Sequence, residues 1–392
     1  MTTDYQEVVE RVTCAVVRDR FGTALRSLIL TGSLARREGT WHHEHGSTRL
    51  AGDAEFMVLF KDGAKLPSDL VRRSVQNLVE EHLLEEGIQA TIGLSPVKSH
   101  FLRTLEPHIF GYELVAHGKT LWGDVNALDL APRFAPSDIP LEDAFRLLMN
   151  RLIELLEALG MAPDLAALPA EVRYKATKLC LDMATSYLLF SDRYESTYRG
   201  RAQALTEYSG NSATVPIPRQ RFSDRTSLAT RWKLGEDCHE PVVNAEHLTT
   251  LIGDVRALWR WELRTLTDSP LSASDDDLLA SWLKHQSLAA GARGWAALAK
   301  RAGISSTIAL LGLPAIATLR VSPRRRIYAA ASSLFFCLPR LVGEPAARPP
   351  RPSKVTLKYL LRLPTPNDFA DWPGAARAIG DFYHHFLEHT RS

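Results

Sequence analysis

The spacing of apolar residues changes along the first third of the chain, and each spacing indicates a type of secondary structure. Residues 5–21 and 70–86 place apolar side chains three or four positions apart, which predicts two amphipathic helices. Short apolar runs over residues 25–30 and 54–60 predict strands, and residues 88–94 are compatible with a third. Helices and strands mixed in this order indicate an α/β or α+β domain, of which we expect the α+β form.

The rest of the chain shows the helical spacing alone. Helices are predicted over residues 141–160, 171–190, 245–267, 275–302 and 368–389. Residues 209–240 are polar and contain prolines, which predicts a long loop. The 392 residues suffice for two or three domains. We expect a mixed sheet with flanking helices over residues 1–130, followed by an all-α region divided into segments 131–270 and 271–392.

Composition and charge narrow the class of protein. The chain is 45% hydrophobic and 23% charged with a net charge of +2, so no overall field favours nucleic acid or a membrane surface. The four cysteines show no CxxC spacing, and the N-terminus has no basic and apolar leader, which predicts a cytoplasmic protein with reduced thiols. Apolar residues 304–319 and 327–342 are shorter than the roughly 20 needed to cross a bilayer, so no transmembrane span and no nucleic-acid module is expected.

A turn and a pair of acids carry the candidate chemistry. The first apolar strand stops at Gly32-Ser33, at the start of a predicted short helix, where free backbone N–H groups and the helix dipole favour an anion such as phosphate. Asp53 and Glu55 open the next strand two positions apart, so their side chains point to one face. Two carboxylates beside a phosphate site are suited to holding Mg²⁺ against a triphosphate.

At these residues the chain resembles the polymerase-β-like nucleotidyltransferase superfamily. The signature is Gly-Ser followed by a later strand with Asp-x-Asp or Asp-x-Glu, which here reads GS at residues 32–33 and DAE at residues 53–55. The segment GYELVAHGKTLWGD, residues 111–124, is similar to an element of small bacterial nucleotidyltransferases, including those that modify aminoglycosides. The resemblance covers the first third of the chain. It implies transfer of a nucleoside monophosphate from an NTP, with ATP expected, to a hydroxyl of an unidentified acceptor, with release of pyrophosphate.

The resemblance also implies roles for individual residues. Gly32 and Ser33 would hold the β- and γ-phosphates, while Asp53 and Glu55 would act as the catalytic acids and hold one or two Mg²⁺ ions. Arg36 is a candidate phosphate contact from the short helix, although a solvated position is an equal alternative.

A lysine from the helical domain is a further candidate. In related enzymes such a lysine often meets the triphosphate, which makes Lys178 a candidate for nucleotide binding. The alternative is a surface ion pair between Lys178 and Asp182, one helical turn later.

The family commonly carries a third acid on a neighbouring strand, and the general base is unassigned here. Residues 88–94 offer Gln89 and Thr91 but no carboxylate. Glu113 is the candidate third acid in its place, with Glu106 as the alternative. Two other functions therefore stay open: a catalytically silent, nucleotide-binding regulatory pseudoenzyme, and a helical interaction scaffold with a degenerate nucleotidyltransferase domain.

Overall fold

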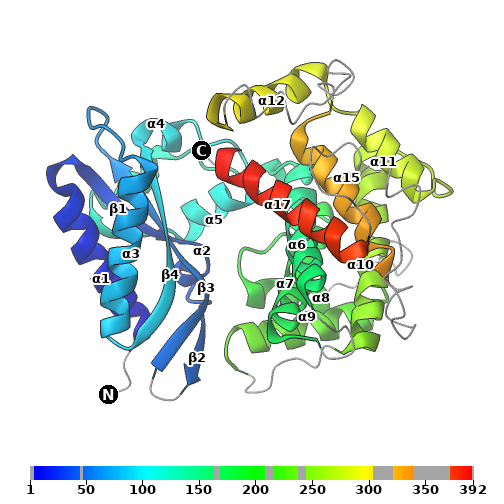
Figure 1. Cartoon of the computed structure of the whole chain (residues 1–392), viewed down its shortest axis with the longest axis horizontal. Coiled ribbons are helices and arrows are strands. Elements are labelled where there is room, and N and C mark those ends of the chain that lie inside the picture. Colours follow the sequence, from blue (N-terminus) through cyan, green and yellow to red (C-terminus); the bar gives the residue numbers. More distant parts are fainter. Residues whose placement is uncertain are drawn as a thin grey trace. The chain divides into compact units, whose positions relative to one another are not determined.

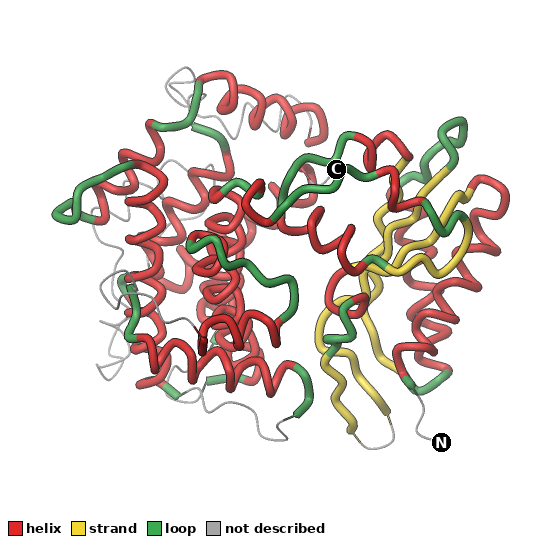
Figure 2. The backbone as a smooth tube through the Cα atoms, turned by 180° about the vertical axis from the view of Figure 1, so that it is seen from behind, coloured by secondary structure: helices red, strands yellow, loops and turns green. Residues whose placement is uncertain are grey.

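The chain folds into two compact units in a computed structural model. The model describes residues 4–44, 47–162, 168–207, 216–236, 244–302, 321–338 and 371–390. The first unit is built from Met1–Asp143, Ser191–Thr206 and Thr230–Glu240, and the second from Ala144–Phe190, Glu207–Ala229 and Pro241–Ser392. Strands occur in the first unit, whereas the described part of the second is helical (Figures 1 and 2). The expected fold class is confirmed; the division at residues 130 and 270 stays a prediction.

A five-stranded sheet forms the centre of the first unit. Its strands are β1 (Leu25–Thr31), β2 (Thr40–Glu44), β3 (Ser47–Phe60), β4 (Ile88–Lys98) and β5 (Lys119–Gly123). The order is β2-β3-β1-β5, and β4 also pairs with β3. The β3–β4 pair is parallel, whereas the β1–β3, β1–β5 and β2–β3 pairs are antiparallel. The long strand β3 therefore links every part of the sheet except β5.

Helices cover both faces of this sheet. The helices of the first 143 residues are α1 (Tyr5–Phe21), α2 (Gly32–Ala35), α3 (Asp69–Glu85), α4 (Ser99–Arg103) and α5 (Ile109–His117), with short 3₁₀ turns at Gly22–Ala24, Ala127–Leu130 and Pro136–Asp138. Successive side chains of a strand point to opposite faces. Phe56 and Val58 accordingly pack with buried valines of α1 and α3, while Met57 and Leu59 pack with Leu102 and Leu114 on the other face.

The described chain beyond β5 is helical. Its helices are α6 (Leu141–Met161), α7 (Ala170–Phe190), α8 (Tyr198–Glu207), α9 (Arg219–Lys233), α10 (Ala245–Thr267), α11 (Asp275–Lys284), α12 (Leu288–Ala302), α15 (Pro323–Phe335) and α17 (Trp372–Thr390). Trp259 of α10 and Trp282 of α11 are almost fully buried, as large aromatic side chains in a helical core often are. The helical prediction for this region is confirmed.

Two local predictions were wrong. The single helix expected over residues 275–302 is divided into α11, which ends at Lys284, and α12, which begins at Leu288. Helix α9 lies within residues 209–240, which were expected to form a loop. Most residues of α9 are polar, so the apolar spacing typical of a helix is hard to recognise in the sequence. Its buried residues Phe222, Ala229 and Trp232 stabilise the helix through tertiary contacts. The apolar residues 304–319 and the proline-rich residues 343–354 lie outside the described ranges. Among the described helices, none is long and apolar enough to cross a bilayer.

Candidate active site

The turn after β1 has the conformation that its glycine predicts. Gly32 follows the strand with φ of +67°, a left-handed conformation that L side chains rarely adopt. A Cβ atom built on Gly32 would lie 2.6 Å from Glu55 Oε2, so a side chain at this position would displace the Glu55 carboxylate. The Ser33 hydroxyl is half-buried and makes no hydrogen bond within the described part of the chain. The turn therefore combines close access to the backbone with an available hydroxyl.

The two acids of β3 lie beside this turn. Asp53 and Glu55 are exposed and the intervening Ala54 is buried, so the two carboxylates share one face of the strand. Glu55 is the register partner of Thr31, and Thr31 Oγ1 donates a hydrogen bond to the Glu55 carbonyl oxygen at 3.2 Å. The sheet thus brings the acid pair and the Gly32-Ser33 turn to one place.

The neighbouring strand supplies no third acid. In the parallel β3–β4 pair, Thr91 is the register partner of Asp53 and Gly93 is that of Glu55. Within the described ranges, no group of three or more His, Cys, Asp or Glu side chains could hold a metal ion together. Mg²⁺ commonly binds one or two carboxylates and completes its shell with water and substrate phosphates. Asp53 and Glu55 fit that need for a metal bound together with a nucleotide.

Arg36 lies directly after the turn, but it is not a free surface cation. Its side chain is 5% exposed, and its Nε and Nη1 donate to Glu38 at 2.8 Å and to Glu113 at 2.5 Å. Burial alone would lower the pKa of Arg36, but the charge of Glu113 and the hydrogen bond to Glu38 hold that pKa above its ordinary value. Its Nη2 has no protein acceptor among the described residues. Its role in nucleotide binding stays a prediction.

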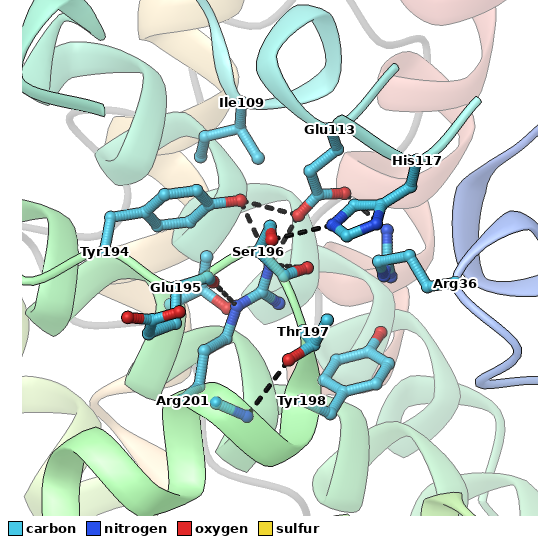
Figure 3. A network of polar contacts seen from close by, with 12 residues as sticks. Arg36, Ile109, Glu113, His117, Tyr194, Glu195, Ser196, Thr197, Tyr198 and Arg201 are labelled. Carbon is cyan, nitrogen blue, oxygen red and sulfur yellow. Dashed lines mark hydrogen bonds and ion pairs between the residues drawn. The ribbon is translucent and has the colours of Figure 1, made fainter. Parts of the chain in front are cut away.

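Glu113 is surrounded by hydrogen-bond donors. One carboxylate oxygen faces Arg36, while the other accepts from the Tyr194 hydroxyl at 2.6 Å and from Arg201 Nη2 (Figure 3). Burial raises the pKa of Tyr194, so its phenol remains a donor at neutral pH. These three donors take most of the roughly four acceptor sites of the carboxylate, and the third-acid role of Glu113 stays a prediction.

The partners of Glu113 were missed from the sequence. Tyr194, Tyr198 and Arg201 come from residues 194–201, reading YESTYRGR, which follow α7 and return to the first unit. His117 of α5 also contacts this segment, through a 2.7 Å hydrogen bond between its Nε2 and Ser196 Oγ. The one sequence signal was the cluster of tyrosine and arginine between two predicted helices, which alone does not indicate a partner.

Lys178 belongs to the second unit. It is half-buried in α7, where its Nζ lies 5.5 Å from the centre of the Tyr174 ring. Burial and then the charge of Arg151 lower the pKa of Lys178 to about 8, although Glu154 and Asp182 oppose the shift. Asp182 forms a 2.6 Å ion pair with Arg151. Lys178 therefore does not form the simple surface ion pair with Asp182 that was the alternative. Its role in nucleotide binding stays a prediction.

Comparisons with known proteins do not establish the chemistry of this site. No protein-family model and no curated protein matches the chain. One matching solved structure is that of a spectinomycin adenyltransferase from Enterococcus faecialis with ATP and spectinomycin. It has 13% identity and a TM-score of 0.38, and the match covers 65% of this chain and 98% of that chain. A likeness this remote carries no argument about chemistry.

Proposed function

We propose that the protein is a Mg²⁺-dependent nucleotidyltransferase that moves a nucleoside monophosphate from an NTP, with ATP expected, to an acceptor hydroxyl. The observation that carries the proposal is the contact between Glu55 and Gly32. Glu55, which shares one strand face with Asp53, lies against a turn with a left-handed glycine and an available serine hydroxyl. An isolated strand-to-helix turn would not need an acid pair on the neighbouring strand beside a left-handed glycine.

Each residue has a defined task in this reaction. The Gly32-Ser33 turn binds the β- and γ-phosphates, while Asp53 and Glu55 bind the metal. When bound, Mg²⁺ neutralises phosphoryl charge and orients the reacting oxygens. The acceptor oxygen forms a bond to the α-phosphorus, the bond from that phosphorus to the bridging oxygen breaks, and pyrophosphate leaves. Positioning and charge neutralisation supply most of the catalysis in such transfers, and the acceptor proton passes to a base that remains unassigned.

A second function is favoured by one observation. Thr91 and Gly93 face the acid pair from β4, where a third carboxylate would complete a catalytic set. A nucleotide-binding regulatory module would keep the turn and the two acids without needing that third group. NTP binding without pyrophosphate release over a broad panel of acceptors would favour this alternative, and failure to bind any NTP with Mg²⁺ would point to a helical interaction scaffold.

A thermal-shift screen of the four NTPs, each with and without Mg²⁺, tests nucleotide binding directly. We expect at least one NTP, ATP first, to raise the melting temperature only when Mg²⁺ is present. A ligand at 100 times its dissociation constant stabilises the folded state by about 2.7 kcal/mol, which is a shift of several degrees. Equal melting temperatures under all eight conditions would contradict the proposal.

Replacing Gly32 by alanine tests the turn. The left-handed backbone should cost the folded state roughly 1 kcal/mol, and the new methyl group should displace the Glu55 carboxylate. We expect Mg²⁺-ATP affinity, measured by calorimetry, to fall about tenfold or more, because both the phosphate approach and a metal ligand change.

Gly22 provides the matched control for this substitution. It also has a positive φ, +46°, but a Cβ atom there meets nothing within 4 Å. Gly22→Ala should therefore lower stability through backbone strain alone, with wild-type ATP affinity. Equal affinities in the two variants would remove the turn from the proposed site.

A further inference from the structure

A network of buried charges in the first unit adjoins the Gly32-Ser33 turn and is not explained by the reaction alone. It contains two arginines and two glutamates, so its formal charges balance: Arg36, Arg201, Glu38 and Glu113. The Arg36, Glu38 and Arg201 side chains are 4–6% exposed and that of Glu113 is 15% exposed. Such a set costs much desolvation free energy, and buried ion pairs contribute little net stability compared with apolar packing. Its retention beside the turn suggests a positional role.

At one end of the network, the backbone that follows the turn is hydrogen-bonded back to the turn. The Glu38 N–H donates to the Ser33 carbonyl at 2.8 Å, so the backbone at residue 38 folds back onto the residue that would bind phosphate. The Glu38 carboxylate accepts from Arg36 Nε through one oxygen. Its other oxygen accepts from the Tyr198 backbone N–H at 2.7 Å. The end of the turn is therefore attached to the first turn of α8.

The other end of the network is anchored more deeply. Glu113 bridges Arg36 and Arg201, and the Tyr194 hydroxyl adds a third donor to its carboxylate. Arg201 is itself fixed, because its Nε donates to the Glu195 carbonyl at 2.6 Å and its Nη2 to the Ser196 carbonyl at 3.2 Å. Charge-assisted bonds of this kind define the geometry of a guanidinium, and they leave the Nη2 group of Arg36 without an acceptor among the described residues.

We propose that this network positions the Gly32-Ser33 turn and the Nη2 edge of Arg36 for the triphosphate, with Glu113 and Arg201 acting as positioning residues. The identity of the ligand in this inference rests on the proposed function. The positioning of the turn by the network does not. Glu113 then serves the site through Arg36, not as the third metal-binding acid. The residues that return from beyond α7 are, on this view, part of the nucleotide site because they hold the turn.

Glu113→Gln tests the inference because it removes the charge that joins the two arginines. We expect amide hydrogen exchange across residues 32–39 to rise about tenfold or more. The dissociation constant for Mg²⁺-ATP should rise about tenfold, whereas that for AMP should change little, since the turn would hold the outer phosphates. A purely structural role would move both ligands equally or neither.

Asp124→Asn is the matched control. Asp124 forms a 2.8 Å ion pair with Arg26, near the start of β1 and therefore at the opposite end of that strand from the turn. The variant also removes a carboxylate from an arginine pair in the same unit, and we expect wild-type exchange at residues 32–39 and wild-type ATP affinity. Tyr194→Phe, which removes one hydroxyl from Glu113, serves if Glu113→Gln loses its circular-dichroism melting transition, and it should raise exchange at the turn by a smaller factor.

The outcomes separate this inference from the proposed function. Wild-type exchange at residues 32–39 in the folded Glu113 variant, or in Tyr194→Phe if the former does not fold, would overturn the network's role whether or not ATP binds. Raised exchange with unchanged ATP affinity would overturn it too, since the turn would be held for another purpose. If exchange rises in the variant but the wild-type protein binds no NTP, the proposed function is wrong. The role of the network in holding the turn would still be supported.

Discussion

The double variant Asp53→Asn, Glu55→Gln should lose Mg²⁺-dependent NTP turnover while keeping its fold. The two amides are nearly isosteric with the acids they replace, but they carry no charge to balance a metal ion. Metal stabilisation of phosphoryl charge contributes several kcal/mol to such transfers, so a loss of about 100- to 1,000-fold is expected. The two side chains are exposed, which limits the change in the free energy of unfolding to about 0.5 kcal/mol.

Pyrophosphate release over a panel of hydroxyl acceptors measures the loss of turnover, and calorimetry with and without Mg²⁺ measures the loss of binding. Glu81→Gln with Glu85→Gln is the matched control: it removes two exposed carboxylates from α3, which packs on the opposite face of the same sheet. The control should behave as wild type in both assays. Wild-type turnover in the Asp53 and Glu55 variant would end the proposed chemistry.

Glu262→Gln should stabilise the helical second unit at neutral and alkaline pH. Glu262 of α10 is fully buried, and its one hydrogen bond within the described chain comes from the Ser186 hydroxyl at 2.7 Å. Burial raises the pKa of Glu262 from 4.5 to about 8, although the bond from Ser186 opposes the shift. The folded state therefore keeps the proton at pH 7, whereas the unfolded state releases it, and folding must take up a proton.

The sign of the pH dependence follows from this difference. As far as Glu262 is concerned, the protein has its full free energy of unfolding below pH 4.5, the pKa of the glutamate in the unfolded state. Part of that free energy is lost as the pH rises through about 8, the pKa in the folded state. One pH unit of separation corresponds to about 1.4 kcal/mol, so the whole separation corresponds to roughly 5 kcal/mol, of which roughly 3 is already lost at pH 7. Glutamine is always neutral and still accepts from Ser186, so the variant should escape this loss.

Urea unfolding followed by far-ultraviolet circular dichroism at pH 5, 7 and 9 measures the effect. We expect the Glu262 variant and wild type to be nearly equal at pH 5 and to diverge as the pH rises. The matched control is Glu246→Gln, an exposed acid in the first turn of the same helix, which should follow the wild-type pH dependence. A wild-type pH dependence in the Glu262 variant would mean that the buried carboxyl is not the group that titrates.

Local periodicity was enough to predict the main elements of the fold. The two-residue alternation of a strand places Asp53 and Glu55 on one face, and the alternating burial of residues 53–56 confirms this arrangement. The helical spacing beyond residue 140 likewise predicted most of the helices. Helices α8 and α9 were not predicted, because both are polar in composition and depend on partners that periodicity does not reveal.

The chain itself determined the turn at Gly32-Ser33, the acid pair on β3 and the mixture of one sheet with many helices, because each depends on residues close in sequence. Only the tertiary structure decided what surrounds Arg36 and Glu113. Their partnership spans 77 residues, and that of Glu113 with Arg201 spans 88. Contacts over such separations arise from packing of whole elements, and a glutamate in a sequence looks the same whether it will meet a metal, an arginine or water.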